Sequence, residues 1–523
     1  MAIKMEKDNP NSKEQDYRSK GSRRKSSGGG MAGPVGNIAG ALLPMLIKKP
    51  KLLLIVLGIA VVAYFLLGKS CSSSNSPLNS QAIQSLFNTG GLFNKEIYEE
   101  TEIYEPLADN KKNPLPESVT LKQFCPTPLN QGKQGSCVAW ASAYAARTIL
   151  EAKRTGANPN KIRYSPSFMY NQISTDRRTC QGSYIKYAMD NLMKVGAVGF
   201  QDFPYDDDDC SRKPGNRLIQ DAQVNKIKGF QRLTEKDKGK SHEMLAMKQN
   251  LAKGSPVIIG MMVGGSFMNN MMGKDVWFPT NSDFNQSGFG GHAMCVIGYD
   301  DYKEGGAFQI MNSWGEKWGK GGFCWVRYSD FKEFNREAYG LYPMGDVFKN
   351  EENRFKGSFG LQLNQGKRNI QLRQAGPFYY ETTEALKAGD KFKVEFTNNI
   401  ECYTYIFGED DDKSIDVLFP YTPKHSPYCG ITGTRLFPRD YSMVPNEHGE
   451  VDRIAILITK EPIDYDVYNK KINEASGNNL EEKIRSAFQY NRGFTSYGAS
   501  QSIDFEMNKG KDAMAFFVIG VRK

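Results

Sequence analysis

The chain has 523 residues, which is enough for more than one domain, and its 39% hydrophobic and 24% charged residues are ordinary for globular proteins. Its formal net charge of +10 would first suggest an acidic partner. Before residue 52, however, eleven Lys and Arg residues face only four Asp and Glu residues, so the rest of the chain is nearly balanced. This distribution argues against a nucleic-acid-binding body and favours a basic tail beside a membrane surface.

The N-terminal part predicts a tail, an anchor and a tether. Residues 1–47 are basic and glycine-rich, which predicts a disordered cytoplasmic tail. Residues 48–69 contain an uncharged apolar run, slightly shorter than the roughly 20 residues that span a bilayer, and lysines at both ends extend its reach. We interpret this run as a single transmembrane helix with the N-terminus inside, which makes the rest extracytoplasmic, either periplasmic or at the cell surface. Residues 70–112 are predicted to be a tether.

A cleaved signal peptide is the alternative interpretation of the apolar run. It would need a basic leader of about fifty residues, and no convincing small-x-small cleavage site follows the run. A lipidated Cys71 fits poorly, because Lys69 and Ser70 precede it. The uncleaved anchor is therefore preferred.

Two compact domains are predicted after the tether, at residues 113–347 and 354–523. The second alternates apolar and polar residues in short runs such as FKVEFTN and AMAFFVIGV, which predicts an all-β sandwich. It shows no catalytic constellation, so either binding of an unknown partner or a purely structural role is expected. Its Cys402 and Cys429 could be bridged in an oxidising compartment.

The richest segment for chemistry is LNQGKQGSCVAWASAYAARTILEAKR, residues 129–154. A glycine-containing loop leads directly into an alanine-rich stretch, and alanine is the strongest helix former. Cys137 is therefore expected at the helix N-terminus, where the helix dipole should lower the pKa of its thiol and make it nucleophilic. Taken alone, a buried structural cysteine is the more common fate.

Two later segments change that balance. GGHAMCVIGY places His292 at the start of a predicted strand, and AFQIMNSWG places Asn312 at the end of the next one. A hairpin of these strands would bring the two side chains together, so that the amide fixes the imidazole tautomer. Trp314 is expected to shield this hydrogen bond from water.

These segments together resemble the papain-like cysteine peptidase family. LNQGKQGSCVAWA is similar to its nucleophile loop, GHAMCVIGY to its histidine strand and NSWGEKWGKGGF to its asparagine motif, and the resemblance runs from about Leu115 to Tyr342. It implies an α+β fold with a helical part and a β-barrel-like part. It also implies a cysteine-type endopeptidase acting on peptides or proteins, with Cys137 as nucleophile, His292 as base and acid, Asn312 as orienter and Gln131 in the oxyanion hole.

The resemblance also indicates where substrate would lie. The segment CQGS resembles the family's substrate-groove segment, so Gly182 and Ser183, together with Gly291 and Trp314, are expected to contact substrate. The sequence departs from the family at Gln134, where a cysteine usually pairs with the groove cysteine that matches Cys180. A pairing of Cys180 with Cys210 is an alternative that the sequence leaves open.

Two further features bear on regulation and on the second domain. The family's long inhibitory pro-segment is not recognisable in residues 70–112, so the sequence does not indicate how activity is restrained. The runs YTYIF at 403–407 and IDVLFP at 415–420, with the region around Pro462, are similar to those of a bacterial module of unknown function that follows peptidase or kinase domains, and residues 354–523 therefore resemble that module.

No metal or organic cofactor is implied. His242-Glu243 begins a zinc-peptidase pattern, but position 246 is alanine, and the acidic runs at 206–209 and 409–412 lack EF-hand spacing. Two alternatives to a peptidase stay open, namely a catalytically inactive papain-like surface binding protein and a cysteine acyltransferase or amidase. The complete set of four candidate catalytic residues argues against the first alternative.

Overall fold

A computed structural model of the chain describes residues 3–8, 88–108, 112–235, 239–342, 344, 354–488, 495–497, 500–508 and 513–523. For residues 239–243, 495–497 and 508 it describes the backbone alone. The predicted membrane anchor at 48–69 lies outside these residues, and within them no helix is long and apolar enough to cross a bilayer. All described residues belong to one compact unit.

The helical half of the first domain is built around the alanine-rich segment. Helix α5 (Cys137–Ala139) continues into the π-helix η2 (Trp140–Arg147) and helix α6 (Thr148–Thr155), which ends at Gly156 with a φ of 68°. All eight residues of η2 are buried, because helices α8 (Pro166–Ile173) and α9 (Ile185–Lys194) and two strands of the domain's sheet pack against it. The helical half also contains α7 (Pro159–Ile162) and α10 (Asn216–Ala222).

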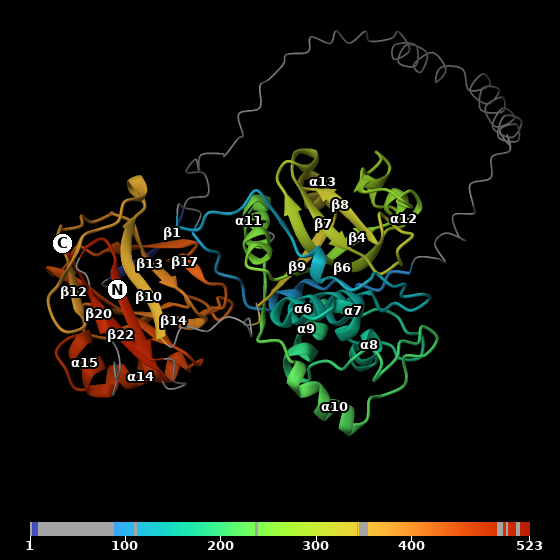
Figure 1. The fold of residues 1–523 in the computed structure, drawn as a ribbon. Coiled ribbons are helices and arrows are strands. Elements are labelled where there is room, and N and C mark those ends of the chain that lie inside the picture. The colour runs from blue at the N-terminus through green and yellow to red at the C-terminus, as the bar shows by residue number, and fades with distance from the viewer. Residues whose placement is uncertain are drawn as a thin grey trace, which may run out of the picture. The chain divides into compact units, whose positions relative to one another are not determined.

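The other half of this domain is an eight-stranded sheet with the strand order β3-β9-β4-β6-β7-β8-β5, and β2 pairs with β6. Figure 1 shows the sheet in yellow-green tones on one side of the domain and helices α6, α8 and α9 on the other. The strands are β2 (Ser118–Thr120), β3 (Phe230–Arg232), β4 (Val257–Val263), β5 (Val276–Trp277), β6 (Gly290–Asp300), β7 (Ala307–Met311), β8 (Phe323–Arg327) and β9 (Asn335–Leu341), with helices α11 (Gly239–Ala252), α12 (Gly265–Asn269) and α13 (Tyr328–Phe334).

The second domain contains two seven-stranded sheets that share a core. The first has the order β1-β18-β13-β10-β21-β20 with β17 on β13, and the second has the order β11-β12-β22-β19-β14-β15 with β16 on β14. Phe359 from the first sheet and Phe517 from the second pack with ring centroids 4.1 Å apart. The strands of the first sheet are β1 (Ile3–Lys7), β10 (Arg354–Leu363), β13 (Phe392–Asn398), β17 (Gly433–Phe437), β18 (Tyr441–Pro445), β20 (Thr495–Tyr497) and β21 (Ile503–Asn508). Those of the second are β11 (Leu372–Gln374), β12 (Tyr379–Thr382), β14 (Cys402–Glu409), β15 (Ile415–Phe419), β16 (Tyr428–Cys429), β19 (Val451–Thr459) and β22 (Met514–Arg522).

The sandwich prediction holds for the two sheets, but the expectation of an all-β domain is wrong. Helices α14 (Tyr465–Glu474) and α15 (Leu480–Ala487) bury Ile472, Leu480 and Ile484 against the outer face of the second sheet. Ile472 is the one buried residue of α14, and only Leu480 and Ile484, four residues apart, are buried in α15, so the apolar stripe of each helix is narrow and gives a weak signal in the sequence. Cys402 and Cys429 lie opposite each other on β14 and β16 and are both free.

Two predictions for the N-terminal part are also wrong. Residues 3–7, expected in a disordered tail, form β1, which pairs antiparallel with β18. Residues 88–108, expected in a tether, include helix α4 (Lys95–Glu99) and contact both domains. Most side chains at positions 103–108 are buried, which a solvated tether would not allow.

Candidate functional site

Cys137 is the first residue of helix α5 and is completely buried. The loop before it is fastened by the Tyr205 hydroxyl, which lies 2.6 Å from the Ser136 hydroxyl and donates to the Gln131 carbonyl at 2.7 Å. The Ala293 backbone N–H donates to the Cys137 Sγ atom at 3.4 Å. Since Ala293 follows His292 on β6, this contact brings the cysteine and histidine segments together.

His292 and Asn312 are joined by a hydrogen bond of 2.7 Å between His292 Nε2 and Asn312 Oδ1. The same Asn312 oxygen accepts the Ser313 backbone N–H at 2.7 Å, and that N–H can only donate. The amide orientation is thereby fixed, so Nε2 must carry the imidazole proton. Nδ1 then holds the lone pair, and among the described residues it has no hydrogen-bond partner although it is buried.

The Trp314 ring stacks on the His292 ring, with centroids 4.4 Å apart and planes inclined by 24°. This arrangement agrees with the expectation that Trp314 shields the bond between His292 and Asn312. The hairpin of β6 and β7 predicted from the sequence supplies both residues, since His292 lies near the start of β6 and Asn312 directly follows β7.

Gln131 is also fully buried beside these residues. Its Oε1 atom accepts the Ser313 hydroxyl at 2.7 Å, and its Nε2 atom donates to the Gln134 carbonyl at 2.9 Å. Its backbone N–H donates to the Ser313 carbonyl at 2.9 Å. The structure therefore brings together all four residues that the sequence predicts as catalytic.

Residues 88–93, which we call the occluding segment, lie across this site. The backbone N–H groups of Gly90 and Gly91 donate to the Gly291 carbonyl at 3.2 and 2.9 Å. Ser183 donates to the Gly90 carbonyl at 2.8 Å and accepts from Leu92 at 2.9 Å. The Trp314 indole N–H donates to the Asn88 carbonyl at 3.0 Å. Three residues predicted to bind substrate, Ser183, Gly291 and Trp314, are therefore hydrogen-bonded to the occluding segment.

The occluding segment fits the site very closely. A Cβ atom on Gly182, the fourth predicted groove residue, would lie 2.9 Å from the Leu92 side chain. The Phe93 ring fills the space above Gly260, where a Cβ atom would lie only 2.5 Å from it, next to Ile185. Sequence reasoning missed Gly90, Phe93 and Gly260, although the Gly-Gly-Leu-Phe run hinted at a close backbone approach followed by an apolar anchor.

Burial has the largest effect on the ionisation of the site. It raises the pKa of the Cys137 thiol to about 12, although N–H groups of Ala293, Val138 and Gly90 act in the opposite direction. Burial likewise lowers the pKa of His292 to about 4, against the hydrogen bond to Asn312. The predicted fall in the pKa of the Cys137 thiol is therefore wrong for this form of the protein. The loss of water destabilises the thiolate more than the helix N-terminus and the N–H groups stabilise it.

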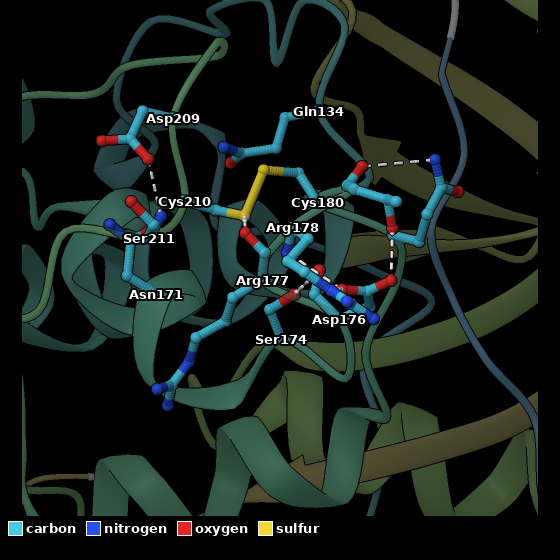
Figure 2. Close-up of a disulfide and its surroundings, with 12 residues drawn as sticks. Gln134, Asn171, Ser174, Asp176, Arg177, Arg178, Cys180, Asp209, Cys210 and Ser211 are labelled. Atoms are coloured by element: carbon cyan, nitrogen blue, oxygen red, sulfur yellow. Dashed lines mark hydrogen bonds and ion pairs between the residues drawn. A yellow bond between two sulfur atoms is a disulfide. The ribbon is translucent and has the colours of Figure 1, made fainter.

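A disulfide borders the groove. Cys180 pairs with Cys210, with Cα atoms 5.8 Å apart, which realises one of the pairings left open by the sequence. Figure 2 shows Gln134, which stands where the resembled family has a cysteine, close to this bridge. Its side-chain amide instead donates to the Asp206 carbonyl at 3.2 Å. The bridge holds the 180–183 loop, which carries the groove residues.

Two protein-family models match parts of the chain. Residues 115–344 match the sequence model described as "Papain family cysteine protease", and residues 385–462 match "Domain of unknown function (DUF4384)". The chain carries a papain-family cysteine peptidase domain. It is followed by a DUF4384 domain, and we use "peptidase domain" and "C-terminal domain" for the two parts from here on.

Among curated relatives, an "Uncharacterized peptidase C1-like protein L477" of Acanthamoeba polyphaga mimivirus is 29% identical over 214 residues, 40% of this chain and 66% of the relative. Cathepsin K of Mus musculus is 27% identical over 233 residues, 43% of this chain and 63% of the relative. The chain thus spans slightly less than two thirds of these relatives. A solved structure of xylellain, a cysteine protease from Xylella fastidiosa, aligns with 23% identity and a TM-score of 0.40, covering 51% of this chain and 98% of xylellain.

Proposed function

We propose that this protein is a cysteine-type endopeptidase in which Cys137 is the nucleophile, His292 the base and acid, and Asn312 the orienting residue. One observation carries the proposal. The hydrogen bond between His292 Nε2 and Asn312 Oδ1 leaves Nδ1 as an unpartnered lone pair in a site that also holds the Cys137 thiol. A buried imidazole nitrogen without a partner is costly in a structural role but serves a proton acceptor well.

The reaction follows from these positions. His292 Nδ1 takes the thiol proton, and the Cys137 sulfur attacks the carbonyl carbon of a peptide bond. The resulting oxyanion accepts from the Cys137 backbone N–H and from the Gln131 side-chain amide. His292 then gives the proton to the leaving amine, the C–N bond breaks and a thioester forms. Water, deprotonated by His292, hydrolyses the thioester and restores the thiol.

This reaction requires the occluding segment to leave the groove. Substrate would then contact the backbone of Gly182, Ser183 and Gly291 in place of the occluding segment. The Trp314 ring would still cover His292. With water readmitted, the anion at Cys137 and the cation at His292 regain solvation, so the thiol pKa should fall and the imidazole pKa should rise towards an ion pair. The form described here is a closed one.

We also propose that the peptidase acts outside the cytoplasm, anchored through residues 48–69, in a topology in which β1 and β18 of one molecule do not pair. The uncharged run flanked by lysines supports an anchor. The disulfide between Cys180 and Cys210 fits an oxidising compartment.

The test uses the full-length chain carrying Phe93→Ala, which loosens the occluding segment, with and without Cys137→Ala. A thiol-directed epoxide should add once to Cys137, as seen by mass and peptide mapping, and a peptide substrate should be hydrolysed. Both signals should vanish in the Cys137→Ala protein. Equal labelling of the two proteins would remove the nucleophile assignment, and transfer to an added amine in preference to water would identify an acyltransferase.

A further inference from the structure

The residues that follow the occluding segment lie between the two domains. We call residues 98–108 the linker segment. On the peptidase side, Tyr104 donates its backbone N–H to the Arg232 carbonyl and Arg232 donates to the Glu102 carbonyl, both at 3.0 Å. The Gln249 amide brackets Leu107 with two hydrogen bonds of 2.9 Å, one to its N–H and one to its carbonyl. The linker segment is therefore fixed to strand β3 and helix α11.

The C-terminal domain holds the opposite side of the same segment. Ile103 donates its N–H to the Lys424 carbonyl and Ala108 donates to the Thr434 carbonyl, both at 2.7 Å. Two arginines reach linker carbonyls, with Arg435 Nε 3.2 Å from the Glu105 oxygen and Arg439 Nη1 3.1 Å from the Tyr104 oxygen. We call the surface made by Lys424, His425, Thr434, Arg435 and Arg439 the latch face.

One side chain of the linker segment enters the latch face. Glu105 Oε1 lies 2.5 Å from His425 Nδ1, and the two side chains are only 3% and 7% exposed. The Tyr421 ring covers His425, with centroids 3.9 Å apart. Removing one partner of a buried hydrogen-bonded pair leaves the polar atom of the other without a partner, so this contact has a strong influence on whether the segment stays bound.

The pattern is that of peptide recognition. Backbone groups at positions 103, 104, 105 and 108 are bonded to the latch face, and a single acidic side chain is inserted between them. Main-chain bonds supply affinity in such complexes, and the pocket for a side chain supplies specificity. Ile103 forms one parallel bridge to Arg232 and another to His425, so the segment is an extended strand placed between two surfaces.

We propose that the C-terminal domain is a peptide-binding latch whose ligand is this chain's own linker segment, and that its grip keeps the occluding segment over Cys137. The inference rests on the proposed function for its consequence, but the binding itself does not require catalysis. The short helix α4 connects the occluding segment to the linker segment. Anchoring one end this close gives the occluding segment a high effective concentration at the groove. Loss of the latch would therefore open the site.

The test measures access to the thiol in the full-length chain. Glu105→Ala and His425→Ala should each raise the rate at which a small thiol reagent labels Cys137 by roughly 10-fold or more, since each breaks the buried pair. Peptide mapping separates Cys137 from the other free cysteines. Glu384→Ala is the matched control, because Glu384 forms an exposed ion pair with Arg368 on the same domain, and it should label at the wild-type rate.

Hydrogen exchange of residues 98–108 provides the second readout. The proposal predicts faster exchange there together with faster labelling in both latch variants. Faster exchange with unchanged labelling of Cys137 would overturn it, because the linker would then be free while the groove stayed closed. Should the alanine variants fail to fold, His425→Gln retains the side-chain volume and tests the same contact. Faster labelling of Cys137 without hydrolysis of a peptide substrate would support the latch proposal and refute the proposed peptidase function.

Discussion

Gly90 lies so close to Gly135 that a Cβ atom on Gly90 would stand 2.1 Å from the Gly135 carbonyl oxygen. Gly135 belongs to the loop that carries the nucleophile, and its backbone N–H is bonded to the Cys180 carbonyl at 3.1 Å. The site can therefore close only because residue 90 has no side chain.

Gly90→Ala should for this reason expel the occluding segment. We expect faster labelling of Cys137 and higher peptidase activity, measured with a small thiol reagent and a peptide substrate. Gly215→Ala is the matched control, since nothing lies within 4 Å of a Cβ atom at that position. Unchanged labelling in Gly90→Ala would show that the segment does not limit access.

Gln131→Ala should reduce the rate of catalysis even when the occluding segment has been expelled from the site. In a Gly90→Ala background, we expect kcat/KM to fall about 100–1,000-fold, as for loss of one oxyanion donor. Gln223→Ala, in an exposed 3-10 helix that carries none of the candidate site residues, should leave kcat/KM unchanged. A loss confined to KM would instead indicate that Gln131 contributes equally to the binding of substrate and transition state.

Removal of the Cys180–Cys210 bridge should destabilise the peptidase domain. The bridge closes a separation of 30 residues, which corresponds to about 3–4 kcal/mol through restriction of the unfolded chain. Cys210→Ser should lower the thermal midpoint, and a reductant should lower the midpoint of the wild-type protein but not of the variant. Equal sensitivity of both proteins to reductant would contradict this expectation.

The closed form should weaken in acid because of His292. Its pKa is lowered to about 4 by burial, from an ordinary value near 6.5, so the closed structure binds fewer protons than the unfolded chain between these values. Its stabilising contribution is present above pH 6.5 and is lost as the pH falls towards 4, at up to about 1.4 kcal/mol per pH unit. Thermal midpoints from pH 7 to 4.5 should therefore fall more steeply for the wild type than for His292→Gln. Parallel curves would refute this assignment.

The proximity of the candidate catalytic residues could be predicted because each member sits in a local pattern. The loop before Cys137, the strand that begins near His292 and the turn after Asn312 are each encoded within about ten residues, and a hairpin joins the last two. The occluding segment could not be predicted in the same way. Its bonds to Gly291 and Ser183 join backbone groups far apart in the sequence, and backbone groups leave no side-chain signature.

The ionisation of the site was predicted wrongly for a related reason. The position of Cys137 at a helix start could be inferred, but the loss of water around it depends on a distant segment that covers it. The Glu105–His425 pair was also hidden, because a histidine and a glutamate 320 positions apart are ordinary residues in sequence. Long-range burial, rather than local propensity, decides both features.

Strand β1 joins the extreme N-terminus to the C-terminal domain, with Ile3 opposite Pro445 and Lys7 opposite Tyr441. Interstrand hydrogen bonds form only when both backbones share one aqueous compartment. A helix crossing the bilayer once between residues 8 and 88 would place these two strands on opposite faces of the membrane. That topology and the β1–β18 pairing within one molecule exclude each other, so protease protection of the N-terminus in intact cells discriminates between them. If the crossing holds, β18 presents an unpaired edge to the exterior, where another extended chain could dock.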